Sequence, residues 1–218
     1  MPASAAKKIE LAPAFGVLLR YPMLILIMFQ GVSVFVLARI LQVNLFQPIL
    51  SEKHFALSSY GVVMSVTSIF EAIGSAWPST LRRWLSDLNS VFVLTLAMAL
   101  SLSFMALSPP FGLVVWMSVF SLACGLSFPI QRQLFNDAIP AEGVPYRATL
   151  MSMESIIDRA ACAGVAAVLG GWVSSGRTFL FLHISAVVSI VAMLILFFAL
   201  NRRSAPRPSR GLRMVLND

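Results

Sequence analysis

Long runs of apolar residues alternate with short polar or proline-rich stretches along most of the chain. An α-helix needs about 20 apolar residues to cross the roughly 30 Å hydrocarbon core of a bilayer. The runs that meet this condition span about 22–49, 59–80, 89–108, 111–133, 147–173 and 178–200. The pattern therefore predicts an all-α polytopic membrane protein with six transmembrane helices.

Two shorter segments flank this predicted bundle, which covers residues 22–200. Residues 1–21 are expected to form a cytoplasmic amino-terminal segment with a short interfacial helix over 9–19, and residues 201–218 a basic cytoplasmic tail. Lys7 and Lys8 precede no apolar region that leads into a small-residue cleavage site, so we expect no cleavable signal peptide.

The composition supports a membrane assignment. Hydrophobic residues make up 58% of the chain and charged residues 11%, whereas a soluble domain carries about 25% charged residues. Cys124 and Cys162 lie inside apolar runs and have neither disulfide-framework nor metal-ligand spacing. We therefore expect both cysteines to be packing residues, and we expect no metal or cofactor.

The basic residues give the bundle an orientation. They stand at the ends of apolar runs and form no basic face, so the net charge of +7 does not indicate nucleic-acid binding. Alternating the six spans places twelve of them on one side: Lys7, Lys8, Arg20, Arg82, Arg83, Arg132, Arg147, Arg202, Arg203, Arg207, Arg210 and Arg213. The other side has Lys53 and Arg177. Lys and Arg are enriched in cytoplasmic loops, so we expect an integral plasma (inner) membrane protein with both termini cytoplasmic.

Four charged residues fall deep inside the predicted spans: Arg39, Glu71, Asp158 and Arg159. Counting about 1.5 Å per residue places all four roughly 15–18 Å below a membrane surface. Each costs at least about 2.5–3.5 kcal/mol to insert, so we expect them to meet near the midplane. One interpretation is a polar transport pathway with Glu71 or Asp158 as a proton-binding carboxylate. The other is an ion-pair network that only orients helices.

Other polar residues extend this candidate region. Gln30, Asn44 and Gln47 fall roughly on one face of the first span, which indicates a wet cavity or hydrogen bonds between helices. Glu154 lies about two turns from the inner end of its span, at heptad distance from Arg147. We interpret these two residues as a gate or an interface salt bridge.

Small residues are concentrated in two of the spans. The span at 147–173 contains Ala160, Ala163, Gly164, Ala166, Ala167, Gly170 and Gly171, and the span at 59–80 contains Gly61, Ser65, Ser68, Ala72, Gly74 and Ser75. Small residues let helices approach closely in lipid. We therefore expect both spans to contact other helices, with Gly164 and Ala167 at an interface.

The order of these features resembles the carboxy-terminal six-helix half of a major facilitator superfamily transporter. The stretches "LLRYPMLILIMFQG", "NLFQPILSEKHFALSSYGVVMSVTSIFEAIGS" and "FPIQRQLFNDAIPAEGVPYRATLMSMESIIDR" resemble the entry to that family's seventh helix and its seventh-to-eighth and tenth-to-eleventh passages. The family's loop signature is reduced to "LRRWLSD". The resemblance implies that the spans at 59–80 and 147–173 face an amino-terminal half, which leaves a separate second half or a homodimer as the expected partner.

These observations favour secondary transport of a small molecule, with proton-coupled efflux as the expected form. A non-transporting fragment or an accessory membrane protein is the alternative. We expect no enzymatic activity: "MESIIDR" faintly resembles the paired-glutamate signature of intramembrane prenyl-protein proteases but has one glutamate, and the chain has no serine-hydrolase elbow or His/Glu metal pair.

The predicted topology can be tested with reporter fusions. Reporters placed after Ser51 and after Asp218 are expected on opposite sides of the membrane, because one position precedes the second span and the other follows the sixth. Paired alkaline phosphatase and fluorescent-protein fusions measure the side of each. Reporters on the same side would contradict the six-span arrangement.

Overall fold

The computed structural model describes residues 11–204 of the 218-residue chain. Lys7, Lys8, Arg207, Arg210, Arg213 and the first two residues of the predicted interfacial helix lie outside these residues. The helices are α1 (Leu11–Arg20), α2 (Pro22–Arg39), the π-helical η1 (Ile40–Leu45), α3 (Phe46–Glu52), the 3-10 helix η2 (Leu57–Ser59), α4 (Tyr60–Ala76), α5 (Pro78–Arg82), α6 (Asp87–Leu107), α7 (Pro110–Asp137), the 3-10 helix η3 (Ala141–Tyr146), α8 (Arg147–Ser174) and α9 (Thr178–Ser204).

Six helical stretches within residues 11–204 are long and apolar enough to cross a membrane, as the sequence predicts. They are Pro22–Glu52, Leu57–Ala76, Asp87–Leu107, Pro110–Asp137, Ala141–Ser174 and Thr178–Arg202. The described residues contain no β-strand. The chain is therefore an all-α, multi-pass membrane protein.

The bounds of two spans differ from the prediction. The second is expected to continue to residue 80, but α4 ends at Ala76 and Pro78 begins the short helix α5. Proline lacks an N–H and fixes its own φ, so it starts helices more easily than it continues them. The fourth is expected to end at residue 133, but α7 continues to Asp137 despite Pro129 within it.

The first span contains a six-residue π-helical segment, η1, between α2 and α3. A π turn widens the helix locally and is rare outside functional segments. Ile40, Leu41 and Leu45 are buried at ordinary helical spacing, with the polar Gln42 and Asn44 between them. Nothing in the hydrophobic pattern therefore distinguishes the π turn from an ordinary helical turn.

The backbones of α4 and α7 touch each other at two glycines. A Cβ at Gly125 would lie well under 3.0 Å from the carbonyl oxygen of Glu71, and a Cβ at Gly74 would overlap the carbonyl oxygen of Leu122 in the same way. No side chain fits in either space, so only glycine permits this approach. Gly74, expected from the sequence to meet another helix, meets one within this chain.

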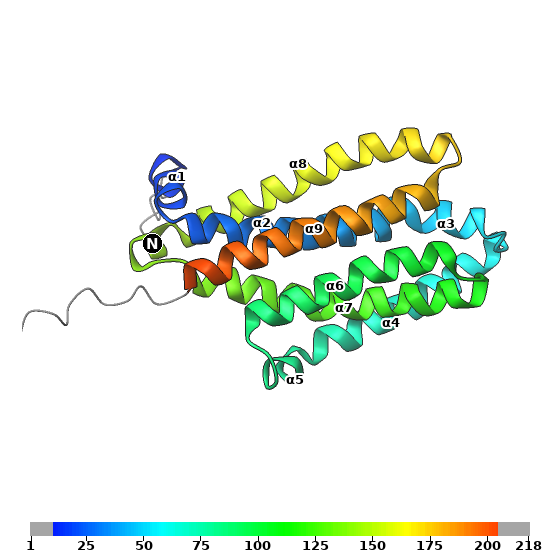
Figure 1. The fold of residues 1–218 in the computed structure, drawn as a ribbon, viewed down its shortest axis with the longest axis horizontal. Coiled ribbons are helices and arrows are strands. Elements are labelled where there is room, and N and C mark those ends of the chain that lie inside the picture. Colours follow the sequence, from blue (N-terminus) through cyan, green and yellow to red (C-terminus); the bar gives the residue numbers. More distant parts are fainter. Residues whose placement is uncertain (1–10, 205–218) are drawn as a thin grey trace, which may run out of the picture.

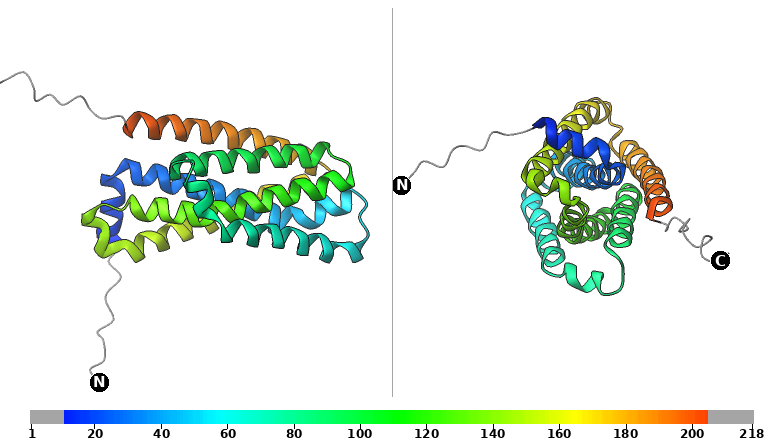
Figure 2. Two further views of the ribbon diagram at one scale, coloured as in Figure 1. Left: turned by 90° about the horizontal axis from the view of Figure 1, so that it is seen from below. Right: turned by 90° about the vertical axis from the view of Figure 1, so that its left-hand side faces the viewer.

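The bundle has two unlike faces (Figures 1 and 2). Helices α2 and α7 pack on each other, α6 packs between α7 and α9, and α4 packs on α7. Helix α8 packs mainly on α2, away from α4. Thus α6 and α9 cover one side of the α2–α7 pair, while α4 and α8 stand at the edges of the other.

Both ends of the described chain lie at the same end of the bundle, beside η3 (Figure 1). Arg20 forms an ion pair with Glu142 at this end, at 3.4 Å. At the opposite end, Lys53 donates to the carbonyl oxygens of Ala106 and Ser108, at 3.2 and 2.8 Å. Its ammonium also stands 4.6 Å from the ring centroid of Phe179. Arg20 and Lys53 thus lie at opposite ends of the bundle, and an even number of spans returns the chain to the end where it began.

Replacing Gly125 with Ala is expected to push α4 away from α7, because the added methyl group meets the Glu71 carbonyl. Overpacking of this kind costs about 1–3 kcal/mol, which should lower the midpoint of thermal unfolding of the purified protein in detergent. Gly61→Ala is the matched control, since nothing lies within 4 Å of a Cβ there. Equal midpoints for the two variants would contradict the close contact.

Candidate functional site

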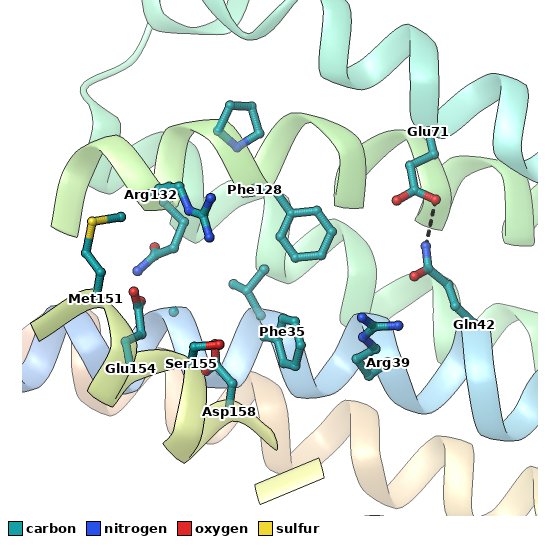
Figure 3. Close-up of a pocket in the computed structure, with 14 residues that line it drawn as sticks. Phe35, Arg39, Gln42, Glu71, Phe128, Arg132, Met151, Glu154, Ser155 and Asp158 are labelled. Carbon is teal, nitrogen blue, oxygen red and sulfur yellow. Dashed lines mark hydrogen bonds between the residues drawn. The ribbon is translucent and has the colours of Figure 1, made fainter. Parts of the chain in front are cut away.

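A cavity of about 640 Å³ opens on the face between α4 and α8, with α2 and α7 at its base (Figure 3). Its walls combine charged, amide, aromatic and small side chains. They are Gly31, Val34, Phe35, Arg39, Gln42, Glu71, Phe128, Pro129, Gln131, Arg132, Met151, Glu154, Ser155 and Asp158. Small-molecule sites have volumes of about 300–1,000 Å³, so the cavity is large enough for such a ligand.

Helical periodicity explains why these side chains share one cavity. Gly31, Phe35, Arg39 and Gln42 follow one another at spacings of four, four and three residues. The α8 residues Met151, Glu154, Ser155 and Asp158 have the i, i+3, i+4, i+7 pattern, and Phe128, Gln131 and Arg132 have the same pattern over one turn of α7. Each set therefore occupies a single stripe on its helix.

At one end of the cavity, Gln42 and Glu71 connect η1 to α4. The Nε2 of Gln42 donates to Oε2 of Glu71 at 2.8 Å and lies 3.8 Å from the sulfur of Cys124 on α7. Figure 3 shows Gln42 and Glu71 facing each other across the cavity. Because the glycine contact fixes α4 against α7, it also fixes where the Glu71 carboxyl group can lie.

Arg39 stands between this end and the aromatic middle of the cavity. Its guanidinium carbon is 5.3 Å from the ring centroid of Phe35, a cation–π distance. Phe35 in turn meets Phe128 edge to face, with centroids 6.5 Å apart and planes at 61°. The two rings divide the Arg39–Glu71 end from the α8 carboxylates (Figure 3).

The other end of the cavity is rich in hydrogen-bond acceptors. Gln131 is only 5% exposed, and its Nε2 donates to the carbonyl oxygen of Ile27 at 3.0 Å. Its Oε1 is buried without a partner, as is Oδ1 of Asp158. The lack of a side chain at Gly31 leaves space for Gln131 and Glu154, because a Cβ there would lie 2.7 Å from both Gln131 Nε2 and Glu154 Oε1. Arg132 is the cation at this end of the cavity.

The four deep charges predicted from the sequence are only partly together. Arg39, Glu71 and Asp158 line the cavity, whereas Arg159 is exposed and lies outside its lining. None of the four forms an ion pair: the salt bridges within 4.0 Å among the described residues are Arg20–Glu142 and Arg82–Asp87. The ion-pair network, one of the two interpretations from sequence, is therefore not formed in this structure.

The amide face expected on the first span does not line the cavity. Gln30 is buried and donates to Oγ1 of Thr95 on α6 at 3.1 Å, so it bonds two helices together. Asn44 is half-buried in η1, and Gln47 is exposed on α3. Gln42, one stripe away from these residues, contributes the amide that reaches the cavity.

Glu154 and Arg147 are also separate from each other. Arg147 donates to Oδ1 of Asn136, at the end of α7, instead of reaching along α8. Glu154 points into the cavity (Figure 3). The expected salt bridge between them is absent from the described residues, because the loop end offers Arg147 a nearer acceptor.

Sequence reasoning missed Gln42, Gln131 and Arg132 as members of this site. A signal exists in the helical stripes, since each lies three or four residues from another cavity residue: Arg39 for Gln42, Phe128 for Gln131 and Arg132. The hydrophobic pattern places Arg132 at the very end of the predicted 111–133 span, where it counts as a cytoplasmic basic residue.

The small residues of α8 lie beside the cavity and remain uncovered. A Cβ at Gly164, Gly170 or Gly171 would meet nothing within 4 Å, and Ala167 is exposed. In the most apolar window of each span, 6% of α8 and 17% of α4 is buried, against 61% of the first span and 56% of α7. The two edge helices are thus the most exposed of the six spans.

No family model, curated protein or solved structure matches this chain. The fold and site therefore define its class by themselves: it is a helical, multi-pass membrane protein with a polar cavity on one face. Among the described residues, no group of three or more His, Cys, Asp or Glu side chains could hold a metal ion.

A double-mutant cycle tests the bond between Gln42 and Glu71. Gln42→Ala and Glu71→Ala are expected to couple, since a hydrogen bond to a charged group contributes about 1.5–3 kcal/mol. The pair Arg39→Ala and Glu71→Ala is the control, and its coupling should be smaller because these two groups form no ion pair. Unfolding midpoints of the purified variants give both couplings, and a larger value for the control pair would contradict this geometry.

Proposed function

We propose that the chain is a six-helix bundle of a facilitator-type secondary transporter, which moves a small molecule through the cavity. The observation that carries this proposal is a charged cavity on one face of an otherwise apolar bundle. Charged side chains within membrane spans are costly, and they mark substrate or ion pathways in membrane proteins.

Ion pairing offers no compensation for these charges. Arg39, Glu71, Arg132, Glu154 and Asp158 all line the cavity, and no salt bridge within 4.0 Å joins any of them. A structural role favours closed ion pairs with every buried acceptor satisfied. A ligand-binding site explains why these charged groups line a cavity without forming ion pairs.

A second six-helix bundle is the partner that this arrangement favours. Secondary transporters hold substrate at the interface of two repeats, which rock against each other around a midplane site. Here the cavity opens between α4 and α8, whose exposed small residues Gly61, Ser65, Ala163 and Gly164 allow close helix approach. The resemblance to a carboxy-terminal facilitator half agrees with this face, with either a separate half or a second copy of the chain as the partner.

Proton coupling and orientation complete the proposal. Glu71 and Asp158 are the carboxylates that would take up and release protons, and efflux is the proposed direction. The end of the bundle that carries Arg20, Arg82 and Arg147 is assigned to the cytoplasm of the plasma (inner) membrane, because basic residues prefer that side.

Cross-linking and transport in the same vesicles test this function. Ala163→Cys, in a background with Cys124 and Cys162 replaced by Ala, is expected to cross-link to the docked bundle. Adding Gly164→Leu should abolish both the cross-link and the proton flux evoked by a panel of small solutes, since the leucine blocks close approach. Val187→Phe, at an exposed position of α9 on the other face, should change neither.

Solute-evoked proton flux from a chain that stays monomeric would contradict the two-bundle arrangement. Absence of both cross-links and flux would reject transport in favour of the accessory or non-transporting role.

A further inference from the structure

Resting on the proposed transport function, we propose that the Glu154–Asp158 end of the cavity binds the N–H donors of an organic ammonium ion, with the ligand's apolar part against Phe128. The ligand class is thus an amphipathic amine. Three independent features of this end lead to that class: its unpartnered acceptors, its charge and its aromatic wall.

The unpartnered acceptors specify a donor. Gln131 is only 5% exposed, and Oε1 of this side chain has no partner while its Nε2 is already engaged by the Ile27 carbonyl. Oδ1 of Asp158 is likewise buried and unpartnered. Buried acceptors without donors are costly. Both oxygens are closed off from the cavity, so a rotation of each side chain would have to bring them to a ligand, whose several N–H groups would then satisfy them. A quaternary ammonium ion has no N–H group and would not.

The charge at this end selects a cation. Glu154 and Asp158 lie one turn apart on α8, and Ser155 between them adds no charge. The charged groups facing them are Arg132 from α7 and, beyond the aromatic rings, Arg39 from α2. With the carboxylates ionised, two negative charges meet one nearby positive charge, so this end attracts a monovalent cation.

The aromatic wall gives the ligand its apolar part. Phe35 stands next to Asp158, and Phe128 lies on the opposite wall of the cavity (Figure 3). Arg39 already occupies Phe35 at a cation–π distance, so Phe128 is the ring left for a ligand. At about 640 Å³ the cavity holds far more than a simple ammonium ion. An amine that carries an aromatic or aliphatic body therefore fits the site better than ammonium itself.

Dansylcadaverine is a suitable probe, because it joins a fluorescent aromatic ring to a primary ammonium group. Its N-acetyl derivative has the same ring and linker without the charge, and its trimethylammonium derivative has the charge without N–H donors on the cationic nitrogen. Fluorescence anisotropy with the full-length protein in lipid nanodiscs measures binding without requiring transport. Dansylcadaverine is expected to bind at least tenfold more tightly than either derivative.

Variants locate the binding site. Asp158→Asn and Glu154→Gln should each weaken dansylcadaverine binding at least tenfold. Glu142→Gln, which removes an exposed carboxylate outside the cavity, should leave it unchanged. Arg132→Gln should tighten binding severalfold by removing the competing cation, and a gain in affinity cannot result from misfolding.

Equal binding of dansylcadaverine and its N-acetyl derivative would overturn the inference. So would unchanged affinity in Asp158→Asn, or weaker affinity in Arg132→Gln. Binding with the expected pattern but without solute-evoked proton flux would reject the transport function and retain this site. Flux evoked only by neutral or anionic solutes, without dansylcadaverine binding, would reject the site and retain transport.

Discussion

The contact between the backbones of α4 and α7 determines where Glu71 lies at the edge of the cavity. Hydrophobic burial does not draw helices together within lipid, so close packing of small residues replaces it. Gly125 meets the carbonyl of Glu71 itself, and the same residue carries the carboxyl group that accepts from Gln42. A packing contact on one side of Glu71 therefore sets the position of a polar contact on the other. Replacing Gly125 with a larger residue would affect the cavity as well as the stability of the bundle.

The two faces of the bundle differ in the kind of surface that they present. On α9 the exposed residues are large, such as Leu180, Val191 and Phe198, and such side chains are well suited to lipid. On α8 they include glycine and alanine as well as Ile156 and Val168, and they lie on the same helix as the ionisable cavity residues Glu154 and Asp158. Lipid chains gain little from small residues and cannot solvate carboxylates. This asymmetry, more than any single residue, favours a protein partner on the cavity side.

The sequence was sufficient to predict the number of spans, because uncharged apolar runs long enough to cross a bilayer are typical of transmembrane helices. It also indicated that Arg39, Glu71 and Asp158 belong to one depth, and the structure places all three at one cavity. It did not give the rotation of each helix about its own axis. Gln30 and Gln42 are both amides on the first span, yet Gln30 bonds to α6 and Gln42 bonds to α4. Rotation depends on contacts between helices, such as the glycine pair, which pattern within one helix does not encode. Arg147 shows the same limit, since its partner Asn136 comes from another helix.

Lys53 has a mechanical consequence for the bundle. Its ammonium fastens the end of α3 to the α6–α7 turn through two carbonyls and rests against Phe179 of α9. One flexible side chain thus joins three elements that are distant in sequence, at the end of the bundle opposite the ends of the described chain. Shear between these elements would have to break charge-assisted hydrogen bonds, which opposes their relative motion at this end. Helix α8 takes no part in the Lys53 contacts and is joined to α9 at this end through the rings of Trp172 and Phe181, so a swing of the helix that carries Glu154 and Asp158 would have to pivot about that contact.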